Sequence, residues 1–273
     1  MVNAMEIRDL GYAYQKKTVL DSIRLGIGKG KIIGILGPNG CGKSTLLKNL
    51  NRNLSPLHGC VMVNDTDIAG ITKKEIAKKI AVVPQTNEVT FAFTVREIVE
   101  MGRMPFLEPF RGMDSKDIEA VEKAIDAAGL RDMQDRLINT MSGGERQRAI
   151  IARAIAQTPE ILLMDEPTLH LDINMQFEVL DLVRKLCDEN GLTVVIVSHD
   201  LPMAARYCDE IAMIHDHNIL CYGTPEEVLT PGNMRTIFNV EAEFGTDPFN
   251  GRKTVYLHGS AAKRQDKYVT RIT

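Results

Sequence analysis

The chain has 273 residues, of which 44% are hydrophobic and 25% charged, so disordered, collagen-like and coiled-coil classes are excluded. The formal net charge of −3 gives no broad attraction to nucleic acid, and we expect no nucleic-acid partner. The five cysteines are scattered, form no metal-binding pair and indicate a reducing compartment.

Antiparallel strands are expected first, because Met5–Leu25 alternates between apolar and polar residues and Val61–Asn64 resembles it. Other apolar runs do not alternate, which is typical of parallel strands buried on both faces. These runs are Lys31–Leu36, Ile80–Val83, Ile161–Met164 and Thr193–Val197. Helical periodicity lies between them, for example over Phe177–Cys187, so the pattern predicts an α/β fold with a mostly parallel sheet.

Two further regions depart from this alternation. From about Phe91 to Leu137 the chain is mostly helical with a Pro/Gly-rich insert at Gly102–Gly112, which predicts an inserted helical subdomain. Glu210–Ile214 and Ile219–Gly223 flank a turn sequence and predict a hairpin. The segment after Gly259 is polar, and we expect it to be peripheral.

The strongest motif is the stretch Gly37–Ser44, which fits G-x-x-x-x-G-K-[ST] between a predicted strand and a predicted helix. Its glycines let successive backbone N–H groups face one anion, and the helix N-terminus adds its dipole. Lys43 is expected to reach the β- and γ-phosphates, and the Ser44 hydroxyl to bind Mg²⁺. The alternative is an ordinary glycine-rich turn between strand and helix.

A second candidate is the pair Asp165 and Glu166, directly after the apolar run Ile161–Met164. Ligands bind at the carboxyl ends of strands in such sheets. Asp165 is expected to hold Mg²⁺, and Glu166 to take a proton from an attacking water. The alternative is an acid pair that stabilises the N-terminus of a helix.

A third candidate is Ser142-Gly143-Gly144, at the start of a predicted helix. The hydroxyl and backbone N–H groups form a possible second anion site, while Ser142 with Glu145 also fits a capping box. One chain with two phosphate sites is explained by dimerisation, in which each site is completed by the other copy.

With these motifs in place, the chain resembles the ATPase subunit of an ATP-binding cassette (ABC) transporter from about Met5 to Gly259. Met141 replaces the Leu that commonly opens this family's signature sequence, here Met141–Gln147. The resemblance implies that Gln85 senses Mg²⁺ and water and that His199 contacts the γ-phosphate. It also implies that Tyr14, rather than Tyr12, stacks on adenine.

Leu169–Asp172 matches the segment that communicates across the ABC dimer, although Leu169 replaces a small polar residue. The expected catalytic residues are Glu166, His199, Gln85 and Lys43, and the expected Mg²⁺ ligands are Ser44, Gln85 and Asp165. The expected ATP-contacting residues are Tyr14, Gly37, Pro38, Asn39, Gly40, Cys41, Gly42, Lys43, Ser44, Thr45, Gln85, Ser142, Gly143, Gly144, Asp165 and Asp172.

The resemblance further implies a homodimer on the cytoplasmic face of the membrane, bound peripherally to two permease subunits and supplied by a solute-binding protein. Residues 1–245 are expected to form the ATP-binding domain, with the helical subdomain at about 88–158, and residues 246–273 a C-terminal extension. The permease is expected near Gln85, with Val89–Phe93 as one candidate contact.

Three stretches are similar to importers of iron–siderophore, haem or cobalamin. They are Thr94–Val99 with Gly102–Pro105, Gly223–Leu229 with Phe238–Glu241, and Asp247–Arg252. Importers of zinc or manganese share parts of them, and helix capping and turns give similar residues. A soluble ABC-type ATPase, for example in iron–sulfur assembly, is the alternative function.

Overall fold

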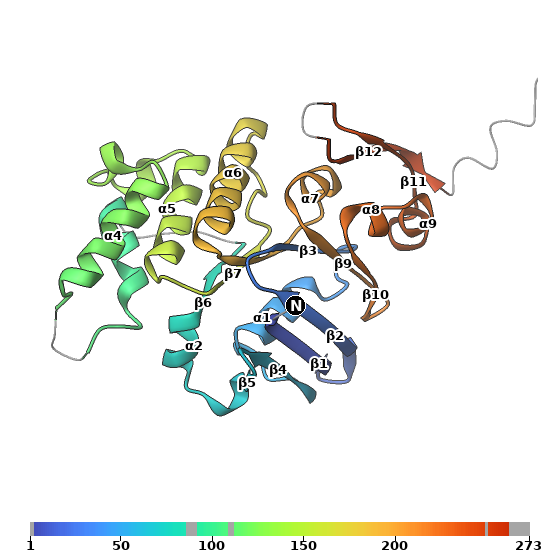
Figure 1. Cartoon of the computed structure of the whole chain (residues 1–273), viewed down its shortest axis with the longest axis horizontal. Helices are drawn as coiled ribbons and strands as arrows, with labels where there is room; N and C mark the ends of the chain where they lie inside the picture. Colours follow the sequence, from blue (N-terminus) through green and yellow to red (C-terminus); the bar gives the residue numbers. More distant parts are fainter. Residues whose placement is uncertain (1–2, 86–91, 109–111, 249–250, 262–273) are drawn as a thin grey trace, which may run out of the picture.

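The computed structural model describes residues 3–85, 92–108, 112–248 and 251–261. Figure 1 shows a central sheet with a helical lobe on the left, an antiparallel sheet below it and a C-terminal hairpin at the upper right. Within the described part of the chain, no helix combines the length and apolar character needed to cross a bilayer.

The central sheet has six strands in the order β10-β9-β3-β8-β7-β6. All neighbours pair in parallel except β10, which is antiparallel to β9 at the edge. The strands are β3 (Ile32–Leu36), β6 (Ile80–Val83), β7 (Ile161–Asp165), β8 (Thr193–Val197), β9 (Glu210–His215) and β10 (Asn218–Gly223). The mostly parallel sheet and the β9–β10 hairpin are therefore confirmed.

Alternate residues of the central strands enter two different cores. In β7, Ile161 and Leu163 belong to one buried cluster, whereas Leu162 and Met164 belong to the other. Because both faces of the strand are buried, its sequence is continuously apolar rather than alternating.

The first core lies between the central sheet and an antiparallel sheet of order β2-β1-β4-β5. Its strands are β1 (Asn3–Tyr14), β2 (Lys17–Gly28), β4 (His58–Val63) and β5 (Thr66–Asp67). Leu46 and Leu50 of α1 (Lys43–Leu50) are buried in this core beside β1 and β2. The expected antiparallel subdomain is confirmed, and α1 contacts both its strand β2 and strands β7 and β8 of the central sheet.

The second core lies on the opposite face of the sheet and is covered by helices. They are α3 (Val95–Glu100), α4 (Ser115–Ala127), α5 (Gly143–Ala156), α6 (Ile173–Asn190) and α7 (Leu201–Tyr207). Capping boxes start α3, α4 and α5 at Thr94, Asp114 and Ser142. Helices α3, α4 and α5 contact one another and form the helical lobe, as the sequence predicts.

Helix α2 (Lys73–Lys79) directly precedes β6 in the chain. At the C-terminal end, α8 (Pro225–Val228) and α9 (Pro231–Asn233) precede the hairpin of β11 (Val240–Thr246) and β12 (Lys253–Ser260), which contacts α7. The domain boundary expected after residue 245 falls inside β11. Residues 89–91 of the expected permease contact and 262–273 of the polar tail lie outside the described residues.

Candidate functional site

The carboxyl ends of four neighbouring parallel strands bring the expected catalytic segments to one edge of the sheet. The strands lie in the order β3, β8, β7, β6 and lead into Gly37, His199, Glu166 and Gln85 respectively. The ends of these strands lie level with one another, because both Ile35 of β3 and Asp165 of β7 lie opposite Val197 of β8. Segments far apart in sequence are thus neighbours at this edge.

The Gly37–Ser44 loop needs glycine at three positions. A Cβ on Gly37 would lie 2.5 Å from the Ile214 carbonyl oxygen. Gly40 has a φ of 81° and Gly42 a φ of 105°, in the left-handed region that other residues rarely adopt. A Cβ on Gly42 would also lie 2.8 Å from a methyl carbon of Leu20 and 3.0 Å from the Val19 carbonyl oxygen. Gly42 caps the N-terminus of α1, so backbone N–H groups that lack helical partners open onto the loop.

Lys43 lies inside this loop with only 7% of its surface exposed. Its Nζ donates to the Gly37 carbonyl oxygen at 2.8 Å and to that of Pro38 at 3.0 Å. The loop thus holds a buried cation whose bonds go to carbonyl oxygens, and no carboxylate of the described residues forms an ion pair with it. A phosphate group that enters the loop meets this charge at short range, where it is less screened than in water.

Ser44 and Asp165 bring oxygen ligands of the kind that Mg²⁺ prefers to the same point. The Ser44 hydroxyl donates to Asp165 Oδ1 at 3.0 Å. Burial raises the pKa of Asp165, while the bond from Ser44 and the charges of Lys48 and Lys43 act in the opposite direction. A partly buried carboxylate with a hydroxyl beside it fits a divalent cation. Lys48 was not among the expected residues, although its spacing of four from Ser44 on one helix places it on the same face.

Glu166 and His199 form a second polar pair at the edge. Glu166 Oε2 lies 2.8 Å from His199 Nδ1. The Glu166 backbone has a φ of 49°, and its N–H donates to the Val197 carbonyl oxygen at 2.9 Å. A left-handed conformation at a residue other than glycine is strained, and such strain concentrates at functional sites. Here it turns the chain sharply at the end of β7 and aims the carboxylate at the imidazole.

The start of α5 is a capping box, as the sequence predicts. Glu145 N–H donates to Ser142 Oγ at 3.3 Å, and Ser142 N–H donates to Glu145 Oε2 at 2.8 Å, which with the Ser142 hydroxyl lowers the pKa of Glu145. Gly144 packs against α6, because a Cβ there would lie 2.3 Å from Met175 Sδ. Gly144 therefore contacts α6, while Ser142 bonds to Glu145 of its own helix. Met175 was not anticipated, and no spacing in the sequence indicates it.

The remaining expected residues lie at or near the surface. Tyr14 is 46% exposed and contacts Tyr12 edge to face with ring centroids 5.0 Å apart. Gln85 and Asp172 are exposed, and Asp172 starts α6 without a capping bond from its side chain. Burial raises the pKa of the Cys41 thiol, which keeps it protonated at neutral pH and fits a packing role.

Comparisons with known proteins agree with this geometry. Residues 20–169 match the family model described as "ABC transporter". The chain is 43% identical over 237 residues to the cobalamin import ATP-binding protein BtuD of Halobacterium salinarum, covering 87% of this chain but 59% of that relative. It is 38% identical over 263 residues to the petrobactin import ATP-binding protein FpuD of Bacillus anthracis, covering 96% of both chains.

Solved structures agree with the fold. A metal-chelate type ABC transporter in an inward-facing conformation matches with a TM-score of 0.82 and 29% identity, over 95% of this chain and 98% of that one. A dimeric ATP-binding cassette bound to ADP and Pi in a post-hydrolysis state matches with a TM-score of 0.69 and 29% identity, over 81% and 98%. The chain belongs to the ABC transporter family of ATP-binding cassettes.

Proposed function

We propose that this chain is the ATP-hydrolysing subunit of an ABC importer that takes up a metal chelate of the iron–siderophore, haem or cobalamin class. One observation carries the ATPase part of the proposal. Two polar pairs, Ser44–Asp165 and Glu166–His199, lie at adjoining strand ends next to the loop that holds Lys43.

In the proposed reaction, the Gly37–Ser44 loop and Thr45 bind the phosphates and Lys43 offsets their charge. Glu166 accepts a proton from the attacking water, and His199 orients the carboxylate and faces the γ-phosphate. The exposed Tyr14 stacks on the adenine base. These residues position the reactants and stabilise charge, and none forms a covalent intermediate.

Ser44 and Asp165 are the residues that would hold Mg²⁺, with Gln85 at the neighbouring strand end. Bound Mg²⁺ supplies positive charge that offsets the developing charge on the phosphate oxygens. Asp165 is suited to this role because its ionised form is disfavoured by burial until a cation is near.

Two copies are proposed to pack head to tail, so that Ser142–Gly144 and Asp172 of one copy face the nucleotide in the other. One of the structural matches is a dimeric ATP-binding cassette bound to ADP and Pi, which supports a dimer here.

Import of a metal chelate is supported by relatives named for the import of siderophores, such as petrobactin, or of cobalamin. Gly102 and Met104 line a groove between the helical lobe and α2, together with Ile80 and Val82 of β6, the strand that leads to Gln85. This groove is the proposed contact with one of two permease subunits, which would hold the chain peripherally at the cytoplasmic face. A solute-binding protein would deliver the chelate to the permease.

The test is to isolate the tagged chain from native membranes in mild detergent and to identify the membrane subunit that co-purifies. The complex is then reconstituted into liposomes. Transport of labelled ferric siderophore, haem or cobalamin is measured in separate preparations. ATP-driven movement of one chelate, abolished by Glu166→Gln, supports the proposal.

A different result favours the alternative. If the chain hydrolyses ATP but only soluble proteins co-purify, it is a soluble ABC-type ATPase such as an iron–sulfur assembly factor. If a permease co-purifies and moves none of the three chelates, the ATPase and permease parts stand and the substrate class is wrong.

A further inference from the structure

Asp247 and Arg252 flank the turn between β11 and β12, and the proposed reaction gives neither of them a role. Their backbones are held together across this turn. The Asp247 N–H donates to the Arg252 carbonyl oxygen at 2.8 Å, and the Gly251 N–H donates to the Asp247 carbonyl oxygen at 2.9 Å. The two residues therefore form one fixed end of the C-terminal hairpin.

Both residues bind Arg206, which lies in the last turn of α7. The Arg206 guanidinium donates to Asp247 Oδ2 at 3.4 Å, and the Arg252 guanidinium donates to the Arg206 carbonyl oxygen at 2.7 Å. The side chain and the backbone of one residue are thus bound by two residues of the hairpin. Strand β12 also packs against α7, so the hairpin holds this helix at its C-terminal end.

The same part of α7 is connected to α6. The Arg206 guanidinium lies over the Phe177 ring of α6, 5.1 Å from the ring centroid, which is within range of a cation–π contact. The next residue, Tyr207, donates from its hydroxyl to Asp181 Oδ1 at 2.6 Å, one turn further along α6. Figure 1 shows α7 between α6 and the hairpin, as these contacts require.

The N-terminal end of α7 lies directly after His199. Asp200 caps the helix, because its Oδ1 accepts from the Met203 N–H at 2.9 Å, and its own N–H donates to Ser198 Oγ at 3.0 Å. At 1.5 Å per residue, Arg206 is about 10 Å along the helix from His199. More than half of the His199 side chain is exposed, so the position of the ring depends on the helix that carries it.

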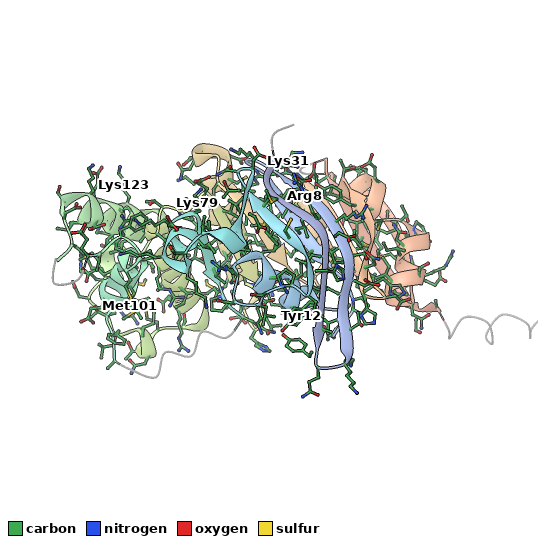
Figure 2. All side chains as sticks on the ribbon, turned by 90° about the horizontal axis from the view of Figure 1, so that it is seen from below. Arg8, Tyr12, Lys31, Lys79, Met101 and Lys123 are labelled. Carbon is green, nitrogen blue, oxygen red and sulfur yellow. The ribbon has the colours of Figure 1, made fainter. Side chains whose placement is uncertain are left out.

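The hairpin lies far from the groove proposed for the permease. In Figure 2 the helical lobe, marked by Met101 and Lys123, lies at the left and the C-terminal segments at the right, with the core between them. Figure 1 shows the same separation. The described contacts of the hairpin therefore lead to the catalytic edge through α7, not to the helical lobe.

We propose that Arg206, held by Asp247 and Arg252, is a positioning residue for ATP hydrolysis that fixes α7 and thereby places His199 against Glu166. The inference rests on the proposed function, in which His199 orients the Glu166 carboxylate. A displacement of about 1 Å at a catalytic group costs up to about 10²-fold in rate. Loss of the hairpin contact therefore slows turnover, whereas ATP binding, which depends on the Gly37–Ser44 loop, is unaffected.

The experiment compares the full wild-type chain with Arg206→Met. Methionine keeps an unbranched apolar side chain against Phe177 but offers no charge to Asp247. We expect kcat for phosphate release to fall about tenfold and KM for ATP to stay within about twofold of wild type. Asp247→Asn should lower kcat in the same direction. The double variant should lose no more than Arg206→Met alone, because both residues act through one contact.

Arg235→Met is the matched control. Arg235 pairs with Glu241 at 2.8 Å, near the start of β11 and at the opposite end of that strand from Asp247. This change removes an exposed ion pair of the hairpin and should leave kcat at the wild-type value. If it lowers kcat as much as Arg206→Met does, the hairpin acts only through its general stability and the inference is wrong.

A His199→Ala background separates the inference from the proposed function, with enzyme concentrations high enough to follow the residual rate. Arg206→Met should cause no further loss of kcat in this background, because the ring that it positions is gone. An equal loss of kcat with and without His199, or wild-type kcat for Arg206→Met alone, would overturn the inference and leave the proposed function standing. If His199→Ala itself keeps the wild-type kcat, the role of His199 in the proposed function fails and the inference with it.

Discussion

Glu166 Oε2 and His199 Nδ1 lie 2.8 Å apart although 33 residues separate them in the sequence. The two side chains differ sharply in environment, since 10% of the Glu166 side chain is exposed and 53% of that of His199. The carboxylate is therefore held in a sheltered position by a ring that is itself open to solvent. This difference in exposure fits a sheltered carboxylate that acts as a base and an exposed histidine that can reach a bound ligand.

Glu166→Gln should leave ATP binding within about twofold of wild type and reduce turnover by about 10²- to 10⁴-fold, the usual contribution of a general base. Glutamine keeps the size of the side chain and can still bond to His199, but it cannot accept the proton. Binding is measured with a fluorescent ATP analogue and turnover by phosphate release. Turnover at the wild-type rate would exclude Glu166 as the base.

Lys43→Ala should weaken nucleotide binding itself by about tenfold or more, because a charge-assisted bond to phosphate is lost. The same change leaves the carbonyl oxygens of Gly37 and Pro38 without their donor, so the empty loop loses two bonds as well. Calorimetric titration with ATP gives the affinity, and Lys48→Ala serves as a control for charge near the site. ATP affinity equal to wild type would contradict the phosphate-binding loop.

Asp165→Asn should raise the melting temperature of the nucleotide-free chain at neutral pH, because it removes the charge of a partly buried carboxylate. The pKa of Asp165 is raised in the folded chain, so its contribution to stability is present at low pH and lost as pH rises through the folded pKa. The gain from asparagine should therefore appear above that pKa and vanish in acid.

The measurement is a series of thermal melts of both chains from pH 4 to pH 8, without nucleotide. In the same variant, Mg²⁺ should no longer increase the affinity for ATP, because one of the two oxygen ligands has lost its charge. A destabilisation by Asp165→Asn that is equal at every pH would contradict the role of burial in raising this pKa.

The sheet and its catalytic edge could be predicted from the sequence because their signals are local. Continuous apolar runs such as Ile161–Met164 identify strands buried on both faces, and glycines with a following Lys43 identify the loop. Since parallel strands share one carboxyl edge, the residues that follow them must meet, and the structure brings Glu166 and His199 into contact.

The contacts between helices could not be predicted in this way. Gly144 against Met175 and Gly102 against the Arg153 carbonyl depend on how α5 is placed between its neighbours, which no spacing along the chain encodes. The groove thus emerges only from tertiary packing.

The tight approach of Gly144 to Met175 can be tested by adding a single methyl group. Gly144→Ala should lower the free energy of unfolding by about 1–3 kcal/mol, the usual cost of overpacking, even though alanine favours the helix over glycine. A Cβ there would lie 2.3 Å from Met175 Sδ and 3.1 Å from its Cβ, so the methionine cannot escape by moving its tip alone. Urea denaturation gives the change.

Gly143→Ala is the matched control, because its Cβ would meet only Leu171 Cδ2 at an ordinary 3.7 Å. This neighbouring change should be neutral or stabilising by up to about 1 kcal/mol. Adding Met175→Ala to Gly144→Ala should recover part of the lost free energy of unfolding. The shorter side chain at position 175 leaves room for the new methyl group at position 144. If both glycine variants are equally stable and Met175→Ala gives no recovery, α5 and α6 do not pack as closely as described.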